Sequence, residues 1–274
     1  MTIKRFLSCV FLILPTLCFA DGKILATPGV SQIEGSGGGG IVPWAQLAGY
    51  ASEDEIAASA FCSVANVKNF SLNVCGAQAN LYDRVELSIA QQQFDVDPLN
   101  VTLKQDIYGA KFRLYGDLIY SNWPQFSLGL QHKRLKTADI AFALGAKEKQ
   151  GTDIYLAASK LHLGAIAGYN FLWNATFRYT QANEMGLLGF GGKNSAAIFP
   201  ELSAAILLSK HIAIGIEYRK KPDNLGLNES HWRDMFIAWF PNKHINLTAA
   251  YLDLDTIAGI GNQQGFYFSL SGQF

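Results

Sequence analysis

The sequence is poor in charge. Only 16% of its 274 residues are Asp, Glu, Lys or Arg, whereas soluble domains typically carry about 25%. Acidic and basic residues are equal in number, at 22 each, so the chain has no excess positive charge with which to attract nucleic acid. A low charge content together with 49% hydrophobic residues indicates a protein whose surface lies partly in lipid.

The sequence also lacks a long hydrophobic run once its first 20 residues are set aside. A membrane-spanning helix needs about 20 consecutive apolar residues, and no later stretch reaches that length. A chain with little charge and no candidate spanning helix fits a transmembrane β-barrel, in which every second side chain of a strand faces lipid. The fold class predicted is therefore all-β, an antiparallel transmembrane β-barrel.

Cysteine and metal-binding patterns are scarce. Only Cys62 and Cys75 lie beyond the first 20 residues, and an even pair of cysteines in an exported protein favours a disulfide. A turn at residues 68–69 would place the two on neighbouring strands. The chain has no C-x-x-C motif, and its five histidines lack the spacing of a zinc site. We therefore predict a Cys62–Cys75 disulfide, no metal site and no cofactor.

The first 20 residues have the pattern of a secretory leader. Basic residues at positions 4–5 precede an apolar stretch over 6–19, and a polar segment begins at residue 21. This pattern predicts export through the Sec pathway with cleavage after Ala20. A membrane anchor and a lipoprotein signal at Cys18 are the alternatives. Pro15 disfavours both, because it interrupts the apolar run and stands where a lipoprotein signal has an aliphatic residue.

The C-terminal segment alternates most clearly between apolar and polar residues. Phe266, Phe268, Leu270 and Phe274 share one face, and serine and glutamine residues occupy the other. A chain that ends in Phe after such a strand resembles the C-terminal signal read by the barrel-assembly machinery. We therefore predict that machinery as a partner during biogenesis, and outer-membrane lipid as the partner of the folded protein.

Six other segments show the same period of two. In each, one face is aliphatic or aromatic and the other is small, polar or charged, as in strands with lipid on one side and water on the other. The segments are 84–89, 110–115, 126–131, 173–180, 212–219 and 245–251. The charged residues expected to face the lumen are Glu86, Lys111, Arg113, Lys133, Arg178, Glu217 and Arg219. Two interpretations stay open for them: an aqueous path that favours anions, or internal ion pairs that fill a narrow barrel.

Turn signals set the size of the barrel. Asn, Asp, Gly and Pro separate the alternating segments, at 68–69, 97–98, 122–124, 221–224, 241–243 and 261–262. Strands of about 9–11 residues plus a turn predict about 12 strands, with 10 and 14 open, and a bore that side chains can largely fill. The longer links near residues 181–199 and 220–230 are expected to be loops on the outer face of the membrane.

One segment is predicted to be a short helix between strands. Residues 138–144 contain three alanines and are followed by Gly145, so we expect Thr137 as the N-cap and Gly145 at C′. Ile140, Phe142 and Leu144 also alternate with other residues, and a strand is the alternative.

A glycine-rich segment from Gly35 to Gly40 precedes Ile41-Val-Pro-Trp-Ala45. Its glycines match G-x-G-x-x-G, but a dinucleotide site needs a strand before them and a helix after them, and Pro43 follows within three residues. Bare backbone bends and packs tightly, so a flexible arm or a plug across the bore is the better interpretation. The predicted domains are a signal peptide (1–20), an N-terminal arm or plug segment (21–40) and the β-barrel (41–274).

The aromatic residues suit the girdles that flank a membrane-spanning band. Packing in a core is the alternative for any single position. The five tryptophans considered are Trp44, Trp123, Trp173, Trp232 and Trp239.

Three groups of residues resemble a family of uncharacterised exported proteins of Gram-negative bacteria, the DUF3034 family. They are Gly29–Gly35 with Gly37–Ala45, Leu144–Lys147 with Gly151–Ala158, and Arg233–Phe236 with Ala249–Leu254. The glycine-rich segment that ends in Val-Pro-Trp-Ala carries the most specific part of the likeness. The resemblance implies an outer-membrane location and supplies no activity and no catalytic residues.

The function indicated is passive: a narrow channel, or a structural protein of the envelope. The enzyme alternative is an outer-membrane, lipid-modifying hydrolase, whose Ser–His–carboxylate or Ser–His–amide site would be assembled by geometry rather than by sequence distance. No catalytic residue stands out in the sequence. The binding alternative is a soluble periplasmic β-protein whose apolar face turns inward and lines a pocket for an apolar ligand.

Overall fold

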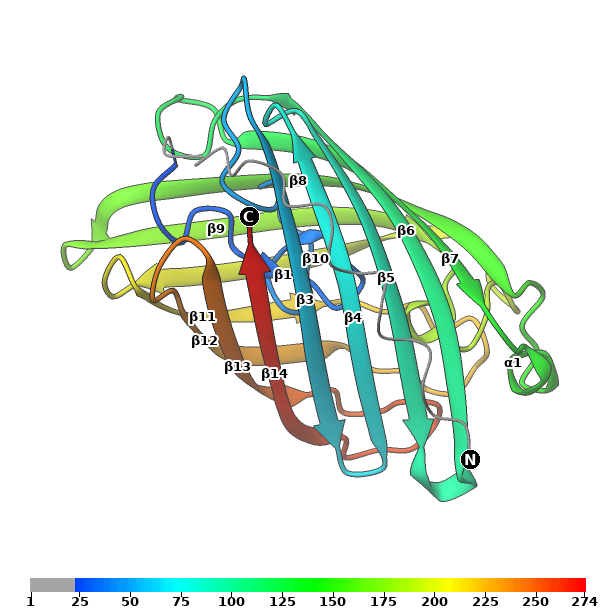
Figure 1. Ribbon diagram of the computed structural model, residues 1–274. Coiled ribbons are helices and arrows are strands. Elements are labelled where there is room, and N and C mark those ends of the chain that lie inside the picture. The colour runs from blue at the N-terminus through cyan, green and yellow to red at the C-terminus, as the bar shows by residue number, and fades with distance from the viewer. Residues whose placement is uncertain (1–22) are drawn as a thin grey trace, which may run out of the picture.

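A computed structural model describes residues 23–274, and the predicted signal peptide with its cleavage site lies outside the described residues. Twelve antiparallel strands form one closed barrel, in which the last strand pairs with the first (Figure 1). The strands are β3 (Ile56–Val67), β4 (Phe70–Leu81), β5 (Val85–Val96), β6 (Val101–Tyr115), β7 (Gln125–Leu135), β8 (Gln150–Ile166), β9 (Tyr169–Thr180), β10 (Ala197–Leu207), β11 (Ile212–Arg219), β12 (Trp232–Trp239), β13 (Ile245–Asp253) and β14 (Gln264–Gln273). The predicted fold and strand number are confirmed.

The remaining elements are short. They are β1 (Val30–Ser31), β2 (Gly37–Gly38), the 3₁₀ turns η1 (Asp97–Leu99) and η2 (Asn183–Gly186), and the helix α1 (Asp139–Ala143). The predicted helix is present, but the predicted cap is wrong: the N-cap is Ala138, and no side chain caps the helix. Gly145 follows with a φ of 102°, the left-handed conformation that ends helices. No helix in residues 23–274 is long and apolar enough to cross a bilayer.

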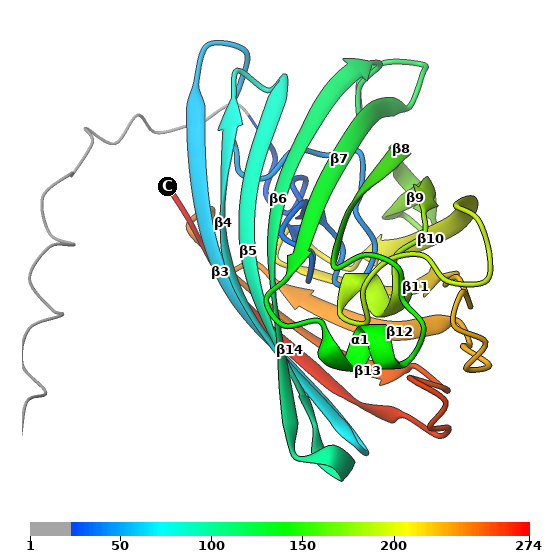
Figure 2. The same ribbon diagram turned by 90° about the vertical axis from the view of Figure 1, so that its right-hand side faces the viewer.

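The two ends of the barrel differ in their connections. We call the end where β3 begins and β14 ends the terminal end; its links are 82–84, 116–124, 167–168, 208–211 and 240–244. We call the opposite end the loop end. Its links are the short 68–69 and 97–100 and the long 136–149, 181–196, 220–231 and 254–263. Helix α1 lies in the first long loop, at the end away from the C-terminus (Figures 1 and 2).

Side chains alternate between the two faces of the barrel wall. Along β12, residues from Trp232 onward are buried and exposed in strict turn. The exposed members are mostly apolar, as at Met235, which is 64% exposed. Polar groups point inward, as at Lys133, which is fully buried. The soluble binding alternative is therefore wrong, because it required the apolar face to turn inward.

A disulfide joins Cys62 and Cys75 on the outer face of the wall. The two residues lie directly opposite each other on β3 and β4, as the predicted turn at residues 68–69 requires. The predicted disulfide is confirmed. It lies next to the seam where β14 pairs with β3 and closes the barrel.

The tryptophans do not all belong to a girdle. Trp123 and Trp239 are 60% and 50% exposed at the terminal end, where an aromatic girdle is expected. Trp44 and Trp232 are each only 4% exposed. For these two the girdle interpretation is wrong, because both side chains are packed inside the barrel.

Candidate functional site

The inside of the barrel is occupied by the N-terminal part of the chain. Every residue from 26 to 51 is buried, and the segment folds back on itself where β1 pairs with β2 (Figures 1 and 2). We call residues 26–51 the plug. The barrel wall begins only at Ile56, so the domain boundary expected at residue 41 is displaced. The apolar run from Ile41 to Ala45 fills the lumen instead of starting the wall.

The plug enters and leaves at the terminal end. Lys23, just before the plug, pairs with Asp83 in the turn between β4 and β5, at an N–O distance of 2.5 Å. The chain after the plug runs into β3 at the same end. The tip of the plug, near Ile33, extends toward the loop end, where the Gln92 amide of β5 donates to the Ile33 carbonyl. The plug is therefore a hairpin inserted from one side.

A charge cluster around Glu34 holds the tip of the plug. The Glu34 carboxylate, which is fully buried, pairs with the three wall cations Lys133, Arg178 and Arg219. The Arg219 contact measures 2.7 Å and the Arg178 contact 3.3 Å. The three cations lie on β7, β9 and β11, so three strands of the wall converge on one plug residue.

The Glu34 cluster is balanced only when the plug is in place. Lys133 also pairs with Asp153 at 2.6 Å, and Arg178 pairs with Glu201 at 2.6 Å. The wall thus supplies three cations but two carboxylates, and Glu34 supplies the third negative charge. A buried charge without a partner is costly. The wall is therefore electrostatically complementary to this plug residue.

Two further wall carboxylates bind the plug backbone. Glu86 accepts hydrogen bonds from the amides of Gly37 and Ala48, at 3.0 and 2.7 Å. Glu217 accepts one from the amide of Ile41 at 2.8 Å and one from the Trp44 indole at 3.2 Å. Carboxylates that receive N–H donors satisfy buried backbone groups that have no strand partner. The irregular plug is thus held by charged side chains of the wall.

Lys111 completes the contact that Glu86 makes with the plug. Its ammonium group lies 3.1 Å from Glu86 and donates to the carbonyls of Gly37 and Gln46, at 2.8 and 2.7 Å. A lysine has three N–H donors, and all three are used. The charges of Glu86 and Lys111 therefore balance each other within the wall, and Lys111 also holds two carbonyl groups of the plug.

Glycine is required where the plug approaches the wall. A Cβ atom on Gly39 would lie 1.8 Å from the Glu217 carboxylate oxygen, and one on Gly37 would lie 2.8 Å from the Ala48 amide nitrogen. Real Cβ atoms do not tolerate such separations. The glycine-rich segment thus allows the plug to pack closely against itself and against charged residues of the wall.

We expect Gly39→Ala to loosen the plug by about 1–3 kcal/mol, the usual cost of overpacking. The added methyl group must push Glu217 away from Ile41 and Trp44. Hydrogen exchange of the plug amides measures this loss, and Gly261→Ala is the control, because its Cβ has no neighbour closer than 3.8 Å. Equal plug protection in both variants would contradict the expectation.

The loop end is covered by an inward fold of the loop between β9 and β10. Residues 182–190, which we call the cap, are all buried and include η2. Glu184 of the cap lies 2.6 Å from Lys221, and Lys221 lies 2.9 Å from Glu229 in the next long loop. The Gln105 amide of β6 donates to the Met185 carbonyl at 3.2 Å. The cap is thus tied both to a neighbouring loop and to the wall.

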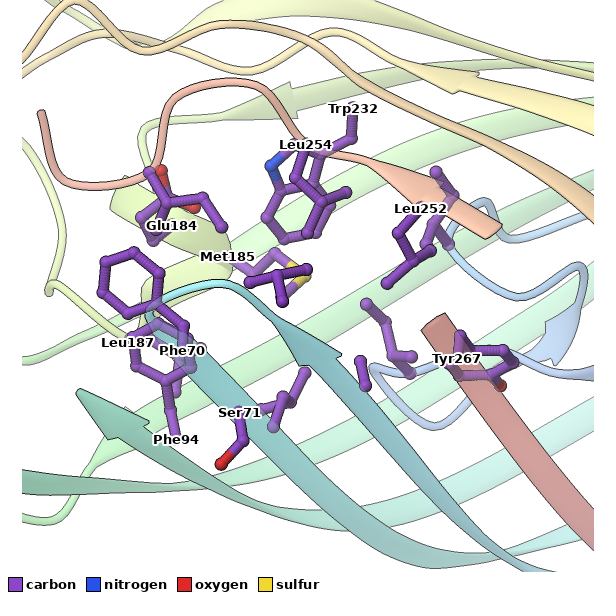
Figure 3. A pocket seen from close by; sticks show the side chains of 16 residues that line it. Phe70, Ser71, Phe94, Glu184, Met185, Leu187, Trp232, Leu252, Leu254 and Tyr267 are labelled. Atoms are coloured by element: carbon purple, nitrogen blue, oxygen red, sulfur yellow. The ribbon is translucent and has the colours of Figure 1, made fainter. Parts of the chain in front are cut away.

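Plug and cap meet at a small apolar cavity of about 40 Å³ near the loop end. Ile33 and Ile41 of the plug line it on one side, and Met185 and Leu187 of the cap on the other. Figure 3 shows the cap residues facing Phe70 and the other labelled wall side chains across this space. A cavity of this size holds one or two water molecules at most, and apolar cavities stay dry. The two segments therefore form an apolar seal.

A carboxyl group in the loop that holds the cap responds to pH. Burial, and next the nearby Glu184 carboxyl group, raise the pKa of Glu229 to about 9, although Lys221 opposes the shift. An acid whose pKa is higher in the folded state stabilises that state below its unfolded pKa, about 4.5. This stabilisation is lost as the pH rises toward 9.

We therefore expect the cap to loosen between pH 5 and pH 9, and Glu229→Gln to remove most of that pH dependence. Protection factors of the amides of residues 183–189, which correct for the intrinsic effect of pH on exchange, measure it. Asp97→Asn is the control, because Asp97 is an exposed acid in the link between β5 and β6. Cap protection that is constant over this range in the parent protein would contradict the expectation.

The predicted lumen residues all have inward positions in the structure. Six of the seven are less than 5% exposed: Glu86, Lys111, Lys133, Arg178, Glu217 and Arg219. Arg113 lies at the terminal mouth instead, paired with Asp83 and with Asp117. The cations of the set pair with carboxylates of the wall and the plug, so of the two interpretations this arrangement fits internal ion pairs.

Three acids that complete the site were not singled out from the sequence. Asp153 and Glu201 alternate with apolar neighbours, so the period of two was present in β8 and β10 and could have identified them. Glu34 lies in an irregular segment with no period. No local signal could have assigned it to the lumen cations.

Three of the histidines make contacts unlike those of a hydrolase. His132 contacts Thr152, His162 accepts from the Trp173 indole, and His211 contacts the Phe240 carbonyl. None of these three contacts is a Ser–His pair. Within residues 23–274, no group of three or more His, Cys, Asp or Glu residues could hold a metal ion.

Comparisons with known proteins bear on the fold. A family model described as "Protein of unknown function (DUF3034)" matches residues 27–271. Curated proteins give no match. Among solved structures, the chain is similar to the KdgM porin, with 7% identity and a TM-score of 0.51 over 79% of this chain and 99% of that one.

Two other solved structures are similar at lower scores. One is the outer membrane protein Omp33 of Acinetobacter baumannii, with 7% identity and a TM-score of 0.48 over 81% of this chain and 100% of that one. The other is the COG4313 outer membrane channel from Pseudomonas putida F1, with 9% identity and a TM-score of 0.43 over 80% and 94%. At these identities the likeness concerns the barrel fold alone.

Proposed function

The chain belongs to the DUF3034 family of proteins of unknown function, and from its lumen we propose that it is a narrow outer-membrane channel held closed by its plug. The fold is that of outer-membrane barrels, and its outer face is apolar. Such barrels have short turns on the periplasmic side and long loops outside. The terminal end is therefore periplasmic and the loop end faces the cell exterior.

The observation that carries the proposal is the complementarity of plug and wall. A barrel that is permanently filled could be apolar inside, whereas this wall carries five carboxylates and four cations that face the lumen. They are Glu86, Asp153, Glu201, Glu217, Asp234, Lys111, Lys133, Arg178 and Arg219. A polar wall suits a water-filled lumen. The plug covers that wall in the closed state.

The competing function is structural, with a plug that never leaves. The balanced charges around Glu34 and the two backbone-binding carboxylates favour a plug that is tightly held. The two functions differ in one measurable property. A channel must conduct ions when the plug moves, and a structural barrel conducts in no state of the intact chain.

A cross-link that fastens the plug to the wall tests the proposal. Ala45 of the plug and Ala157 of β8 belong to one small buried cluster, and the Ala45 amide donates to the Ser159 hydroxyl two residues further along β8. Cysteines are introduced at positions 45 and 157, and thiol titration shows whether they form a disulfide. The substitutions are made in a chain that lacks Cys62 and Cys75, and Ala45→Cys alone is the control. Conductance is recorded in planar bilayers before and after addition of a reductant.

We expect brief openings in the parent protein and the control, none in the oxidised double variant, and their return on reduction. Openings that persist in the oxidised double variant would contradict the proposal, because ions would then bypass the space that the plug fills. Silence of the parent protein, the control and the reduced variant alike would favour the structural function.

The C-terminal strand supports a second part of the proposal, the mode of assembly. Phe266, Phe268, Leu270 and Phe274 all point outward and are 54–65% exposed. An apolar outward row on the last strand is available to a partner before the barrel closes against β3. We propose this row as the signal for the barrel-assembly machinery. Export through the Sec pathway, with cleavage after Ala20, is proposed for the leader.

A further inference from the structure

A cluster of basic side chains lies on the outside of the barrel near the loop end. Lys104 on β6, with Arg134 and Lys136 at the end of β7, are exposed and point away from the lumen. The amide of Lys136 donates to the carbonyl of Lys104 at 2.7 Å, and Arg134 lies opposite Asp106 in the register of β6 and β7. Side chains directly opposite each other on neighbouring strands have Cβ atoms about 4.5–5.5 Å apart. We call these three residues the basic cluster.

The basic cluster lies just above the apolar band of the same strands. Tyr108 and Ile89 are paired outward-facing residues that are 54% and 57% exposed. Each step of two residues along a strand moves about 6.6 Å toward the loop end, so Asp106 and then Lys104 follow Tyr108. The cluster therefore lies where lipid hydrocarbon gives way to headgroups.

The basic cluster carries three positive charges against two nearby outward carboxylates, Asp106 opposite Arg134 and Asp95 diagonal to Lys104, so it keeps a net positive charge. Asp106 pairs with Lys136 at 2.6 Å and accepts from Gln91 at 3.0 Å. Among residues 23–274, no carboxylate lies within ion-pair distance of Lys104 or Arg134. Lys104 and Lys136 also face each other across two strands, and like charges in that position are destabilising. An external anion would relieve the repulsion.

The cluster belongs to one side of the barrel. On the opposite side, Phe177, Ile198 and Met235 point outward near the loop end and are 54%, 64% and 64% exposed. The basic residue beside them, Arg233, is single and lies opposite Asp253. The loop end also carries single exposed basic residues elsewhere, among them Lys68, Lys193 and Lys220. The basic cluster differs because it places three cations on two neighbouring strands beside an apolar surface, as a ligand with both an anionic group and acyl chains would require.

We propose that the basic cluster binds the phosphate groups of lipid A in the outer leaflet, while its acyl chains pack against the band around Tyr108 and Ile89. Lysine and arginine bind phosphate through charge-assisted hydrogen bonds, and each cation near an anionic lipid surface contributes to binding. The inference rests on the proposed outer-membrane orientation. It does not depend on movement of the plug.

The test compares two triple variants of the full-length protein in detergent. One is Lys104→Gln/Arg134→Gln/Lys136→Gln. The matched control, Lys68→Gln/Lys193→Gln/Lys220→Gln, removes three exposed positive charges from the same end of the barrel, outside the cluster. Native mass spectrometry measures binding of lipid A with both phosphates, of lipid A without phosphates, and of inorganic phosphate. Heat-modifiable gel mobility shows that each variant is folded.

We expect lipid A binding to weaken roughly a hundredfold in the cluster variant, and to be unchanged in the control. In the parent protein, lipid A without phosphates should bind weakly, with the affinity that lipid A with both phosphates has for the cluster variant. Inorganic phosphate should not displace lipid A from the parent protein. Equal binding of the two lipids, equal loss in both variants, or displacement by inorganic phosphate would each overturn the inference. The cross-linking experiment on the plug is independent of all three results.

Discussion

Deletion of residues 26–51 is expected to raise the single-channel conductance by an order of magnitude or more, turning brief openings into a steady current. The plug fills the lumen between the terminal end and the apolar seal, and its removal exposes wall carboxylates and cations to water. Barrels of about 8 strands are filled by side chains and those of 16–18 strands leave an aqueous channel. A barrel of twelve strands lies between these limits, so an open but narrow bore is expected.

The measurement is planar-bilayer recording of the deletion variant beside the parent protein, at the same protein-to-lipid ratio. The wall should still close, because the pairing of β14 with β3 does not involve the plug. Heat-modifiable mobility checks that closure. A folded deletion variant with the conductance of the parent protein would contradict the channel proposal, since the loop cap alone would then suffice to seal the barrel.

The barrel itself could be predicted from the sequence because its determinants are local. A strand such as β12 alternates residue by residue between lipid and lumen, and that period is visible without any tertiary contact. The Cys62–Cys75 pair followed from one turn between two neighbouring strands. The determinants of the helix were also local, but its N-cap was not predicted correctly. The N-cap is Ala138 instead of Thr137, and no side chain forms a capping hydrogen bond.

The plug could be predicted only as a possibility, since its contacts are distant in sequence. Glu34 pairs with Arg219, which lies 185 residues away, and Trp44 donates to Ser203, 159 residues away. Neither residue belongs to a periodic segment. The same limit explains Trp44 and Trp232, which have the residue type of a membrane girdle and the environment of a core. Residue type alone does not show whether a tryptophan lies in a membrane girdle or in a core.

The cap was beyond sequence reasoning for a further reason. Glu184 and Met185 both adopt positive φ angles, 42° and 58°, although residues other than glycine rarely do so. Their conformation is stabilised by Lys221 and Gln105, which come from other elements. A loop was expected near residues 181–199, but its inward fold depends on these tertiary contacts.

Loss of the Glu34 charge is expected to release the tip of the plug. In Glu34→Ala the cluster keeps three cations and two wall carboxylates, so one buried positive charge has no partner. Removing one member of a buried ion pair costs about 3–5 kcal/mol, and the plug can avoid that cost by leaving the wall to water. We therefore expect the amides of residues 30–41 to lose protection from hydrogen exchange, by roughly a hundredfold to a thousandfold or more.

Two further variants separate the charge of Glu34 from other effects. Glu34→Gln keeps the shape of the side chain and should release the plug nearly as well as Glu34→Ala, since the missing charge is the cause. Glu53→Ala is the control: its pair with Arg84 joins side chains that are 80% and 57% exposed, and such pairs contribute about 0–1 kcal/mol. The expectation is wrong if the plug amides are as well protected in Glu34→Ala as in Glu53→Ala. Packing and backbone contacts would then hold the plug, and the balance of charge around Glu34 would not be what keeps the barrel closed.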